Sequence, residues 1–381
     1  MRWGRAHDGR LRRHRGRDLR LRRRARRVRG ARPAAPLGLV RPGDRPGRHD
    51  RRVLRDAVHR RAAARRLRRF FVSAVALALD FGGTKVEAAL VDADGAVVPG
   101  SRFRRPSGGT SDSATLQAAV LDVLAQARAA VTADQELIGA GVGSAGPITV
   151  AEGLVSPLNV PAWRDFPLKK LVEDALPGVP VTLQMDGICI TLAEHWVGAA
   201  QGVDNVMGMI VSTGVGGGLV LGGRTVAGPT GNAGHIGHIE AGGFDDACPC
   251  GGRGCLEAVA SGPRTVAWAR TQGFTGSTGE ELAEAHRAGD PVAIAAIDRA
   301  GRAIGQVVAS ATSLVDLEVV AIGGGFSHSS PRLFEAAREA VAERSEFGFV
   351  TKVRIVPSGL SHDGPLIGAG ALVHRADRLG D

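Results

Sequence analysis

The hexapeptide Asp80-Phe81-Gly82-Gly83-Thr84-Lys85 joins two apolar runs, residues 75–79 and 86–91, whose composition predicts two β-strands. Glycines lack a Cβ atom, so the backbone N–H groups of Gly82 and Gly83 can approach phosphate oxygens, and the Thr84 hydroxyl adds a donor. A carboxylate at a strand end, such as Asp80, can hold Mg²⁺ through water. The chain contains no Gly-x-x-x-x-Gly-Lys-Ser/Thr sequence, so this is not a Walker loop. An ordinary β-hairpin also fits the hexapeptide.

A second glycine-rich segment, Ser212-Thr213-Gly214-Val215-Gly216-Gly217-Gly218, is expected to form a glycine turn between strands at 206–211 and 219–221. A third, Gly323-Gly324-Gly325, follows a predicted strand at 319–322. Neither segment has the helix start and distant acidic residue of a Rossmann motif. Each alone also fits a hairpin. Together the three segments predict two phosphate loops and an adenosine loop of a duplicated, hinged ATP-binding fold. The residues expected to contact the nucleotide are Asp80, Gly82, Gly83, Thr84, Lys85, Thr213, Gly214, Gly323 and Gly324.

Strand and helix patterns alternate along the chain after residue 72, which indicates an α/β protein with its site at strand ends. Further strands are predicted at 137–142 and 179–183. Helices are predicted at 113–130, with Asp112 or Ser111 as the cap, and at 189–198, 256–271, 280–288, 291–314, 331–342 and 366–379.

Three cysteines, Cys248, Cys250 and Cys255, lie within eight residues, and His238 precedes them. Three thiolates and one imidazole match a tetrahedral structural zinc site, and the glycines among them permit the turn that brings them together. The alternative is three cysteines without a metal, which would leave exposed thiols open to oxidation. The sequence therefore predicts zinc held by these four residues.

Charge separates the first 71 residues from the rest of the chain. They hold 27 Arg, no Lys and 5 Asp, a net charge of +22, whereas the remainder has 22 basic and 33 acidic residues and a net charge of −11. The whole chain has 54 Gly and 44% hydrophobic residues, and the part after residue 71 is long enough for two lobes of roughly 150 residues. This composition excludes fibrous, collagen-like and disulfide-stapled proteins, and the few cysteines suit a reducing, cytoplasmic location.

The Arg-rich segment has too few large apolar side chains to offset the entropy of ordering, so we expect it to be disordered apart from a basic helix at 53–71. It resembles either an electrostatic nucleic-acid tail or a translated upstream region, with Val72 or Val75 as the true start. Residues 65–69 with the apolar run 70–79 resemble a twin-arginine signal. We reject a signal peptide because the apolar run is short, begins far from the start of the chain and leads into Asp80 of the glycine-rich hexapeptide. No apolar stretch is long enough to span a membrane.

Several of these motifs, in order, resemble the ROK family of sugar kinases and sugar-responsive repressors, over residues 75–373. They are residues 80–85, 212–218, 234–238, 248–257 and 323–325. The resemblance implies a two-lobed, actin-like kinase fold that closes over ATP and a hexose and transfers the γ-phosphate to the sugar 6-hydroxyl. It implies a small lobe at 72–184 completed by a helix at 364–379, a large lobe at 185–363, and Mg²⁺, structural zinc and a homodimer.

By position, Asp186 matches the catalytic base of the family, which must accept the proton of the attacking hydroxyl. Asn159, Glu257 and His238 match sugar ligands, with the second ring nitrogen of His238 free for the sugar. Without the resemblance, Asp186 reads equally as a helix N-cap, Asn159 as a turn residue and Glu257 as a solvated first-turn carboxylate. Met185 and Ile188 depart from the Asn residues usual in the family, and Ile188 removes a local hydrogen-bonding group.

His235 stands where most family kinases have Glu, and with His238, Ser212 and residues 361–364 it resembles the bacterial N-acetylmannosamine kinases. The expected activity is therefore phosphorylation of N-acetylmannosamine at O6, with glucose or N-acetylglucosamine kinase as alternatives. If His235 only orients His238, glucose is expected to be the preferred substrate. A sugar-responsive regulator is a further alternative, but no helix-turn-helix pattern is found. A nucleic-acid partner is expected only if the Arg-rich segment is native.

Overall fold

The computed structural model describes residues 72–108, 110–360 and 362–380. The Arg-rich segment and its predicted helix at 53–71 lie outside these residues. Within them, no helix has the length and apolar character needed to cross a membrane.

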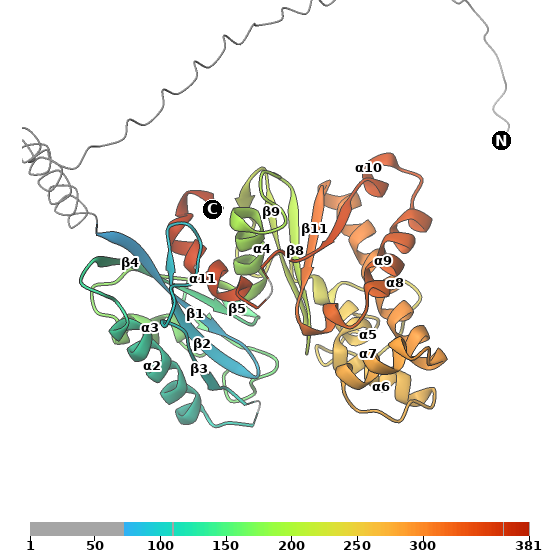
Figure 1. Cartoon of the computed structure of the whole chain (residues 1–381), viewed down its shortest axis with the longest axis horizontal. Coiled ribbons are helices and arrows are strands. Elements are labelled where there is room, and N and C mark those ends of the chain that lie inside the picture. Colours follow the sequence, from blue (N-terminus) through green and yellow to red (C-terminus); the bar gives the residue numbers. More distant parts are fainter. Residues whose placement is uncertain (1–71, 109, 361, 381) are drawn as a thin grey trace, which may run out of the picture. The chain divides into compact units, whose positions relative to one another are not determined.

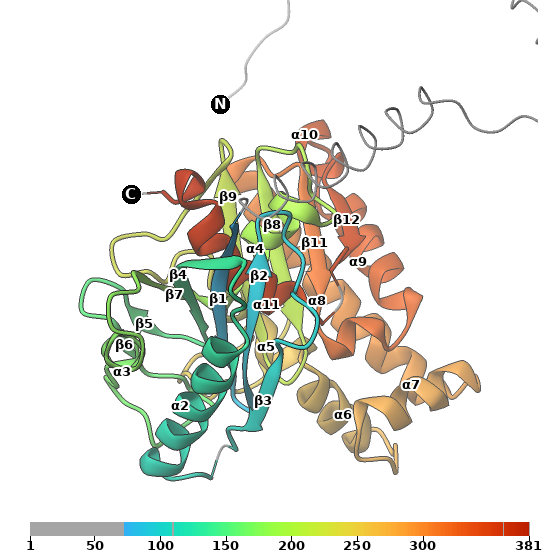
Figure 2. The same ribbon diagram turned by 60° about the vertical axis from the view of Figure 1, so that its left-hand side comes forward.

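The first sheet has five strands in the order β3-β2-β1-β4-β7 (Figure 1). β1 runs antiparallel to β2 and parallel to β4. The helices α2 (Ser113–Ala129) and α3 (Leu168–Ala175) pack their apolar side chains against one face of this sheet (Figure 2). The strand bounds are β1 Ser73–Phe81, β2 Lys85–Asp92, β3 Phe103–Pro106, β4 Gln135–Ser144 and β7 Val181–Met185.

The second sheet repeats this arrangement with the order β10-β9-β8-β11-β12. Its first strand, β8, runs antiparallel to β9 and parallel to β11, as β1 does with β2 and β4. The expectation of a duplicated strand arrangement is therefore confirmed. The bounds are β8 Val206–Val211, β9 Val215–Leu221, β10 Arg224–Thr225, β11 Val319–Gly323 and β12 Arg354–Pro357, and a short pair, β5 Ile148–Thr149 and β6 Leu154–Val155, stands apart.

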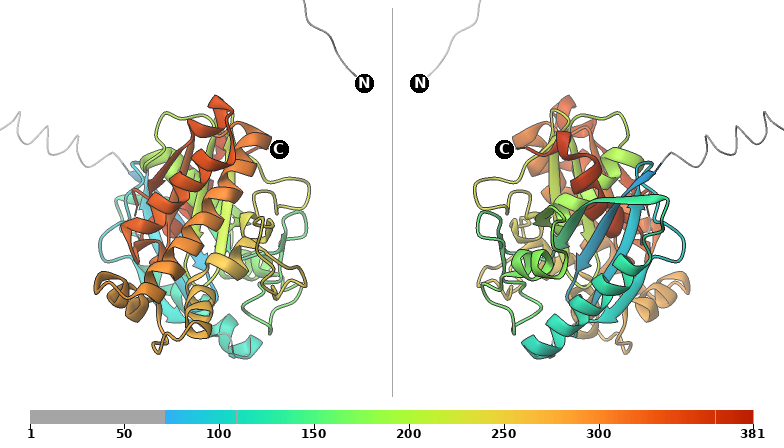
Figure 3. Two further views of the ribbon diagram at one scale, coloured as in Figure 1. Left: turned by 90° about the vertical axis from the view of Figure 1, so that its right-hand side faces the viewer. Right: turned by 90° about the vertical axis from the view of Figure 1, so that its left-hand side faces the viewer.

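Helices cover one face of the second sheet, where they form the largest apolar core with β8 and β11 (Figure 3). The long helix α8 has an apolar face that is buried along most of its length. The helices are α5 Leu256–Ala260, α6 Gly262–Thr271, α7 Gly279–Arg287, α8 Pro291–Val315, α9 Pro331–Arg344 and α10 Gly348–Thr351.

Two helices, α4 (Asp186–Val197) and α11 (Gly364–His374), lie between the sheets and contact each other. Glycines allow the backbones to touch: a Cβ atom on Gly368 would lie 2.1 Å from the Cys189 carbonyl oxygen, and one on Gly141 of β4 would lie 1.7 Å from that of Ala369. On the other side, a Cβ atom on Gly187 would lie 2.1 Å from the Gly217 carbonyl oxygen of β9. The start of α4 is thus held by both sheets.

The other end of α4 is tied to the connection between β12 and α11 by Glu194, which is fully buried. Its carboxylate accepts hydrogen bonds from the N–H groups of Ala199 at 2.7 Å and Gly359 at 3.1 Å, and from the Ser358 hydroxyl. A buried carboxylate needs such donors because they replace the lost hydration. Glu194 therefore joins the two segments through which the chain passes from one sheet to the other.

Three of the predicted elements differ from the structure. The predicted helix 256–271 is two helices separated at Ser261, whose backbone is extended, because Pro263 is accommodated only at the start of a new helix. The predicted glycine turn at 212–218 is shorter, because β9 begins at Val215 and its glycines make room for α4. The helix predicted at 366–379 ends at His374.

Other predicted elements agree more closely with the structure, and some elements of the structure were not predicted. The strand at 206–211 and the helices at 113–130, 280–288 and 291–314 are confirmed within two residues at each end. The helix expected from residue 189 begins at Asp186. α3 and β12 were not predicted, since short, weakly apolar segments carry little periodic signal. The predicted lobe boundaries stay a prediction.

We expect Gly368→Ala to lower the free energy of unfolding by about 2 kcal/mol or more, because the new methyl group meets the backbone of α4. Helix propensity alone would favour alanine by about 1 kcal/mol. A decrease in the free energy of unfolding would therefore show that the backbones of α11 and α4 are in close contact. Gly348→Ala in α10 is the control, because no atom lies within 4 Å of its added methyl group. Urea unfolding measures both; equal stability of the two variants would contradict the packing argument.

Candidate active site and metal centre

Asp80 lies near the end of β1, directly before the first glycine loop, and is 7% exposed. Its pKa is raised to about 7, chiefly by burial and then by the charge of Asp186, whereas the charge of Lys85 opposes both. The loop closes through a hydrogen bond from the Gly82 N–H to the Lys85 carbonyl oxygen at 3.0 Å, while Thr84 is exposed. An exposed hydroxyl beside a buried carboxylate suits a loop that meets a phosphate and its metal ion.

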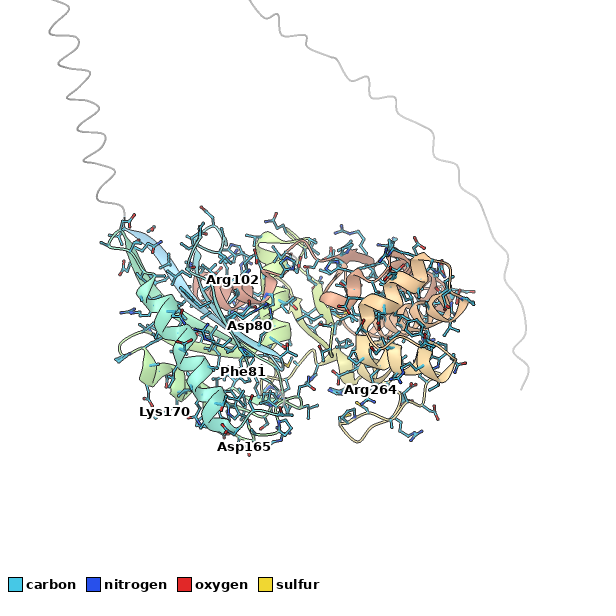
Figure 4. All side chains as sticks on the ribbon, turned by 60° about the horizontal axis from the view of Figure 1, so that its bottom comes forward. Asp80, Phe81, Arg102, Asp165, Lys170 and Arg264 are labelled. Carbon is cyan, nitrogen blue, oxygen red and sulfur yellow. The ribbon has the colours of Figure 1, made fainter. Side chains whose placement is uncertain are left out.

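Basic side chains surround this end of the first sheet, but acidic residues already pair with them. Lys85 and Arg104 both bind Glu87, and Arg102 binds Asp363 at 2.6 Å (Asp80 and Arg102 are labelled in Figure 4). A hollow of about 540 Å³ is lined by Glu87, Arg102, Arg104 and His362. Lys85, predicted to contact phosphate, is therefore held by Glu87 in this structure.

Asp186 is the first residue of α4 and follows β7 directly. Burial raises its pKa to about 6, although its side chain accepts a hydrogen bond from the Gly187 N–H at 2.7 Å. The N-cap position of α4 belongs to Met185, and Asp186 makes no capping bond of the kind that Asp112 makes to Thr115 in α2. A partly buried carboxylate with a raised pKa is better suited to accept a proton than to cap a helix.

Glycines of both sheets surround Asp186. A Cβ atom on Gly216 of β9 would lie 3.8 Å from its Oδ1 atom, and one on Gly143 of β4 would lie 3.9 Å from its Cα atom. Ile188, where the family has a polar residue, is fully buried in the apolar core of the first sheet. Glycine backbone from both sheets thus lies close to this carboxylate.

Asn159 lies beside the first glycine loop and near the second, and Glu257 lies beside the second. A Cβ atom on Gly83 would lie 2.8 Å from Cβ of Asn159, so these two residues touch. A Cβ atom on Gly214 would lie 2.6 Å from Oε2 of Glu257 and 4.0 Å from Nδ2 of Asn159. The same Oε2 atom accepts the Val215 N–H at 3.0 Å. Glu257 is therefore a bound, half-buried carboxylate beside the second loop.

The third glycine segment lies next to the second. Gly324 has φ +93°, which only glycine adopts readily, and a Cβ atom there would lie 2.6 Å from the Val211 carbonyl oxygen. A Cβ atom on Gly325 would lie 3.8 Å from the Ser212 hydroxyl oxygen, and the Gly262 N–H donates to the Ser212 carbonyl oxygen at 2.8 Å. The predicted second phosphate loop and adenosine loop are thus neighbours at the ends of β8 and β11.

His235 and His238 lie edge to face, with ring centroids 4.8 Å apart. Burial, and then the charge of His238, lowers the pKa of His235, which favours the neutral imidazole. A Cβ atom on Gly146, in the loop after β4, would lie 3.4 Å from Cε1 of His235. His235 therefore faces the loop that follows the central strands of the first sheet.

Asn232 was missed by sequence reasoning, although it orients the His235 loop. Its side-chain amide pairs with both backbone groups of Ile148: Oδ1 accepts the N–H at 2.9 Å and Nδ2 donates to the carbonyl oxygen at 2.7 Å. The sequence offers only a turn-forming residue between glycines, and no local signal separates this pairing from an ordinary turn. Asn232 fastens the segment carrying His235 to the loop that begins at Gly146.

The predicted metal ligands His238, Cys248, Cys250 and Cys255 converge, and their ligand atoms all lie within 4.8 Å of one another. Nδ1 of His238 lies 3.6 Å from Sγ of Cys248, and the Sγ atoms of Cys250 and Cys255 are also 3.6 Å apart. Tetrahedral zinc with Zn–S bonds of about 2.3 Å places its sulfur ligands about 3.8 Å apart. The donor set and spacing fit zinc, and Nε2 of His238 is left for another partner.

Residues 76–376 match the sequence model of the ROK family, and the chain belongs to that family. The N-acetylmannosamine kinase of Escherichia coli is 31% identical over 297 residues, covering 77% of this chain and 97% of the relative. The crystal structure of a ROK family glucokinase from Streptomyces griseus with glucose and AMPPNP has a TM-score of 0.69, 28% identity, and coverage of 79% and 99%. A ROK family transcriptional regulator, a homologue of the E. coli MLC protein, has a TM-score of 0.69, 25% identity, and coverage of 80% and 79%.

We expect the purified protein to hold about one zinc ion per chain, and Cys250→Ser to lose it, because a hydroxyl is a poor replacement for a thiolate ligand. Cys189→Ala is the matched control, because Cys189 is buried in α4 outside the cluster. Metal analysis after gel filtration measures the zinc content. Equal zinc in Cys250→Ser and the wild type would remove Cys250 from the ligand set.

Proposed function

We propose that this protein is an ATP-dependent sugar kinase that phosphorylates the 6-hydroxyl of an N-acylated hexosamine or a hexose. The observation that carries the proposal is Asp186, a partly buried carboxylate with a pKa of about 6 that lies between glycine-rich strands of both sheets. A general base with a pKa near neutrality can take the proton of a hydroxyl as the phosphoryl group moves to it. Relatives of similar identity are named for glucose as well as for N-acetylmannosamine.

In this mechanism Asp186 orients the 6-hydroxyl and accepts its proton, while Asn159, Glu257, His235 and His238 hydrogen-bond the sugar ring. The N–H groups of the first two glycine loops hold the phosphates, and Gly323 and Gly324 contact the adenosine. Asp80 would hold Mg²⁺ through water, and the chemistry that the ion would supply there is neutralisation of charge on the transferred group. Zinc would keep the loop carrying His238 in place. Closure of an actin-like pair of lobes around the substrates excludes water.

A sugar-responsive regulator is the second candidate, favoured by the similarity to a ROK transcriptional regulator. Such a protein binds sugar without turning it over, so Asp186 and the first glycine loop would serve no chemistry. An assay that couples ADP release to NADH oxidation, run over a panel of sugars, separates the two candidates. Sugar-dependent ADP release supports the kinase, and sugar binding without ADP release supports the regulator. Dimer formation and a cytoplasmic location stay predictions.

We expect Asp186→Asn to lower kcat by about a hundredfold or more, because the amide cannot accept the proton. The base works only when ionised, so kcat/KM should fall as the pH drops through about 6 to 7, where Asp186 and Asp80 titrate as an interacting pair. Asp112→Asn at the N-cap of α2 is the control, and it should leave kcat unaltered and stability nearly unaltered, because Asn caps a helix about as well as Asp. Steady-state kinetics from pH 5 to 9 measure these effects, and near-normal turnover in Asp186→Asn would assign that residue a structural role.

We expect N-acetylmannosamine to be the best substrate and His235→Glu to shift preference toward glucose. An imidazole offers one donor and one acceptor, whereas a carboxylate offers acceptors only, so the hydroxyl pattern that it pairs with changes. A site that pairs an acetamido group rejects sugars without one, because its polar groups lose their partners. Values of kcat/KM for N-acetylmannosamine, N-acetylglucosamine and glucose decide the matter. A wild type that prefers glucose, with no change in His235→Glu, would contradict the assignment.

A further inference from the structure

One side chain outside the predicted site, Arg299 of α8, contacts both flanks of the zinc loop, defined here as residues 244–255. Its Nη2 atom lies 2.5 Å from Oδ2 of Asp246, two residues before the first cysteine ligand. Its Nη1 atom donates to the Val259 carbonyl oxygen at 3.4 Å, two residues after Glu257 in α5. The guanidinium therefore joins the segment that precedes the cysteine ligands to α5, which follows them.

Aromatic rings hold this guanidinium in place. The Cζ atom of Arg299 lies 4.9 Å from the ring centroid of Phe244 and 5.2 Å from that of Trp268 in α6. The side chain is 15% exposed, and its partner Asp246 is 25% exposed. Partial burial strengthens both the ion pair and the cation–π contacts relative to exposed ones. By contrast, the neighbouring pair of Arg253 with Asp245 is mostly exposed.

Backbone hydrogen bonds carry this restraint to the metal ligands. The Asp246 carbonyl oxygen accepts the Gly254 N–H at 2.9 Å, and Gly254 precedes the ligand Cys255. The Gly254 carbonyl oxygen in turn accepts the Ala241 N–H at 2.8 Å, on the segment that follows His238. A restraint on Asp246 thus reaches ligands on both sides of the cluster.

We propose that Arg299 is a positioning residue for the zinc loop, and through that loop for the sugar contacts of His238 and Glu257. The sugar part of this proposal rests on the proposed function, whereas the metal part does not. Partners behind metal ligands hold them in the geometry that the metal requires, and their loss typically lowers metal affinity or activity about 10- to 100-fold. Arg299 would act more on sugar affinity than on nucleotide affinity, because its guanidinium contacts the zinc loop, α5 and α6, and none of these contacts goes directly to the predicted nucleotide loops at residues 80–85, 212–214 and 323–324.

The test compares Arg299→Gln with Arg302→Gln in the full-length, zinc-loaded protein. Arg302 lies one turn farther along α8 and forms an exposed ion pair with Glu343 of α9, so it controls for losing an arginine from this helix. Zinc release to a chromogenic chelator is timed, and Kd is measured by calorimetry for N-acetylmannosamine and for AMPPNP. Arg299→Lys retains the charge but not the forked geometry, and Asp246→Asn removes the ion pair from the other side.

We expect Arg299→Gln to release zinc about tenfold faster and to raise the sugar Kd about tenfold, with an unchanged AMPPNP Kd. For zinc release and sugar Kd, Arg299→Lys should give values between those of Arg299→Gln and the wild type. Asp246→Asn should give values close to those of Arg299→Gln, and Arg302→Gln should give wild-type values. Zinc release and sugar Kd at wild-type values in Arg299→Gln would overturn the proposal, as would equal weakening of sugar and AMPPNP. If Arg299→Gln does not fold, Asp246→Asn decides by the same criteria. A wild type that binds no sugar would sink the proposed function, and the zinc-release comparison would still decide the role of Arg299.

Discussion

Backbone contact through glycine at the start of α4 determines where the proposed catalytic carboxylate lies. Gly187, the residue after Asp186, has no room for a Cβ atom against β9, and Gly218 of β9 has none against the same turn of the helix. On the opposite side, Gly368 lets α11 approach Cys189 equally closely. Protein interiors are closely packed, so a helix that backbone contacts hold on two sides keeps its first residue in a defined place. The carboxylate of Asp186 depends on that placement.

The electrostatics of the site follow from the same packing. Asp80 is buried and Asp186 is partly buried, and the pKa of each rises because burial disfavours the charged form. The basic residues near the first loop are paired with Glu87 and Asp363, so neighbouring positive charge compensates the two aspartates only in part. Two carboxylates with pKa values near neutrality suit a site that binds a metal ion and a hydroxyl and releases a proton.

The predicted metal ligands and two of the proposed sugar contacts lie in one stretch of the chain. His238 belongs to both sets, and Glu257 follows the last cysteine by two residues, so a metal that fixes the loop would also fix these two proposed contacts. Asn232 and Ile148 link the His235 segment to the loop after β4. The segment that carries His235 is therefore joined by hydrogen bonds to a loop of the first sheet.

Local chemistry was enough to predict the glycine-rich connections, the convergence of His238 with the three cysteines and most long helices, because each leaves a pattern in the nearby sequence. It was also enough to select Asp186, Asn159 and Glu257 as candidates once the family resemblance was seen. The break at Ser261, the extension of β9 through Gly216–Gly218, the pairing of Lys85 with Glu87 and the contacts of Asn232 and Arg299 were decided only by the tertiary structure. Each of these depends on which distant backbone or side chain comes within a few ångströms, and a linear pattern of residues does not encode that distance.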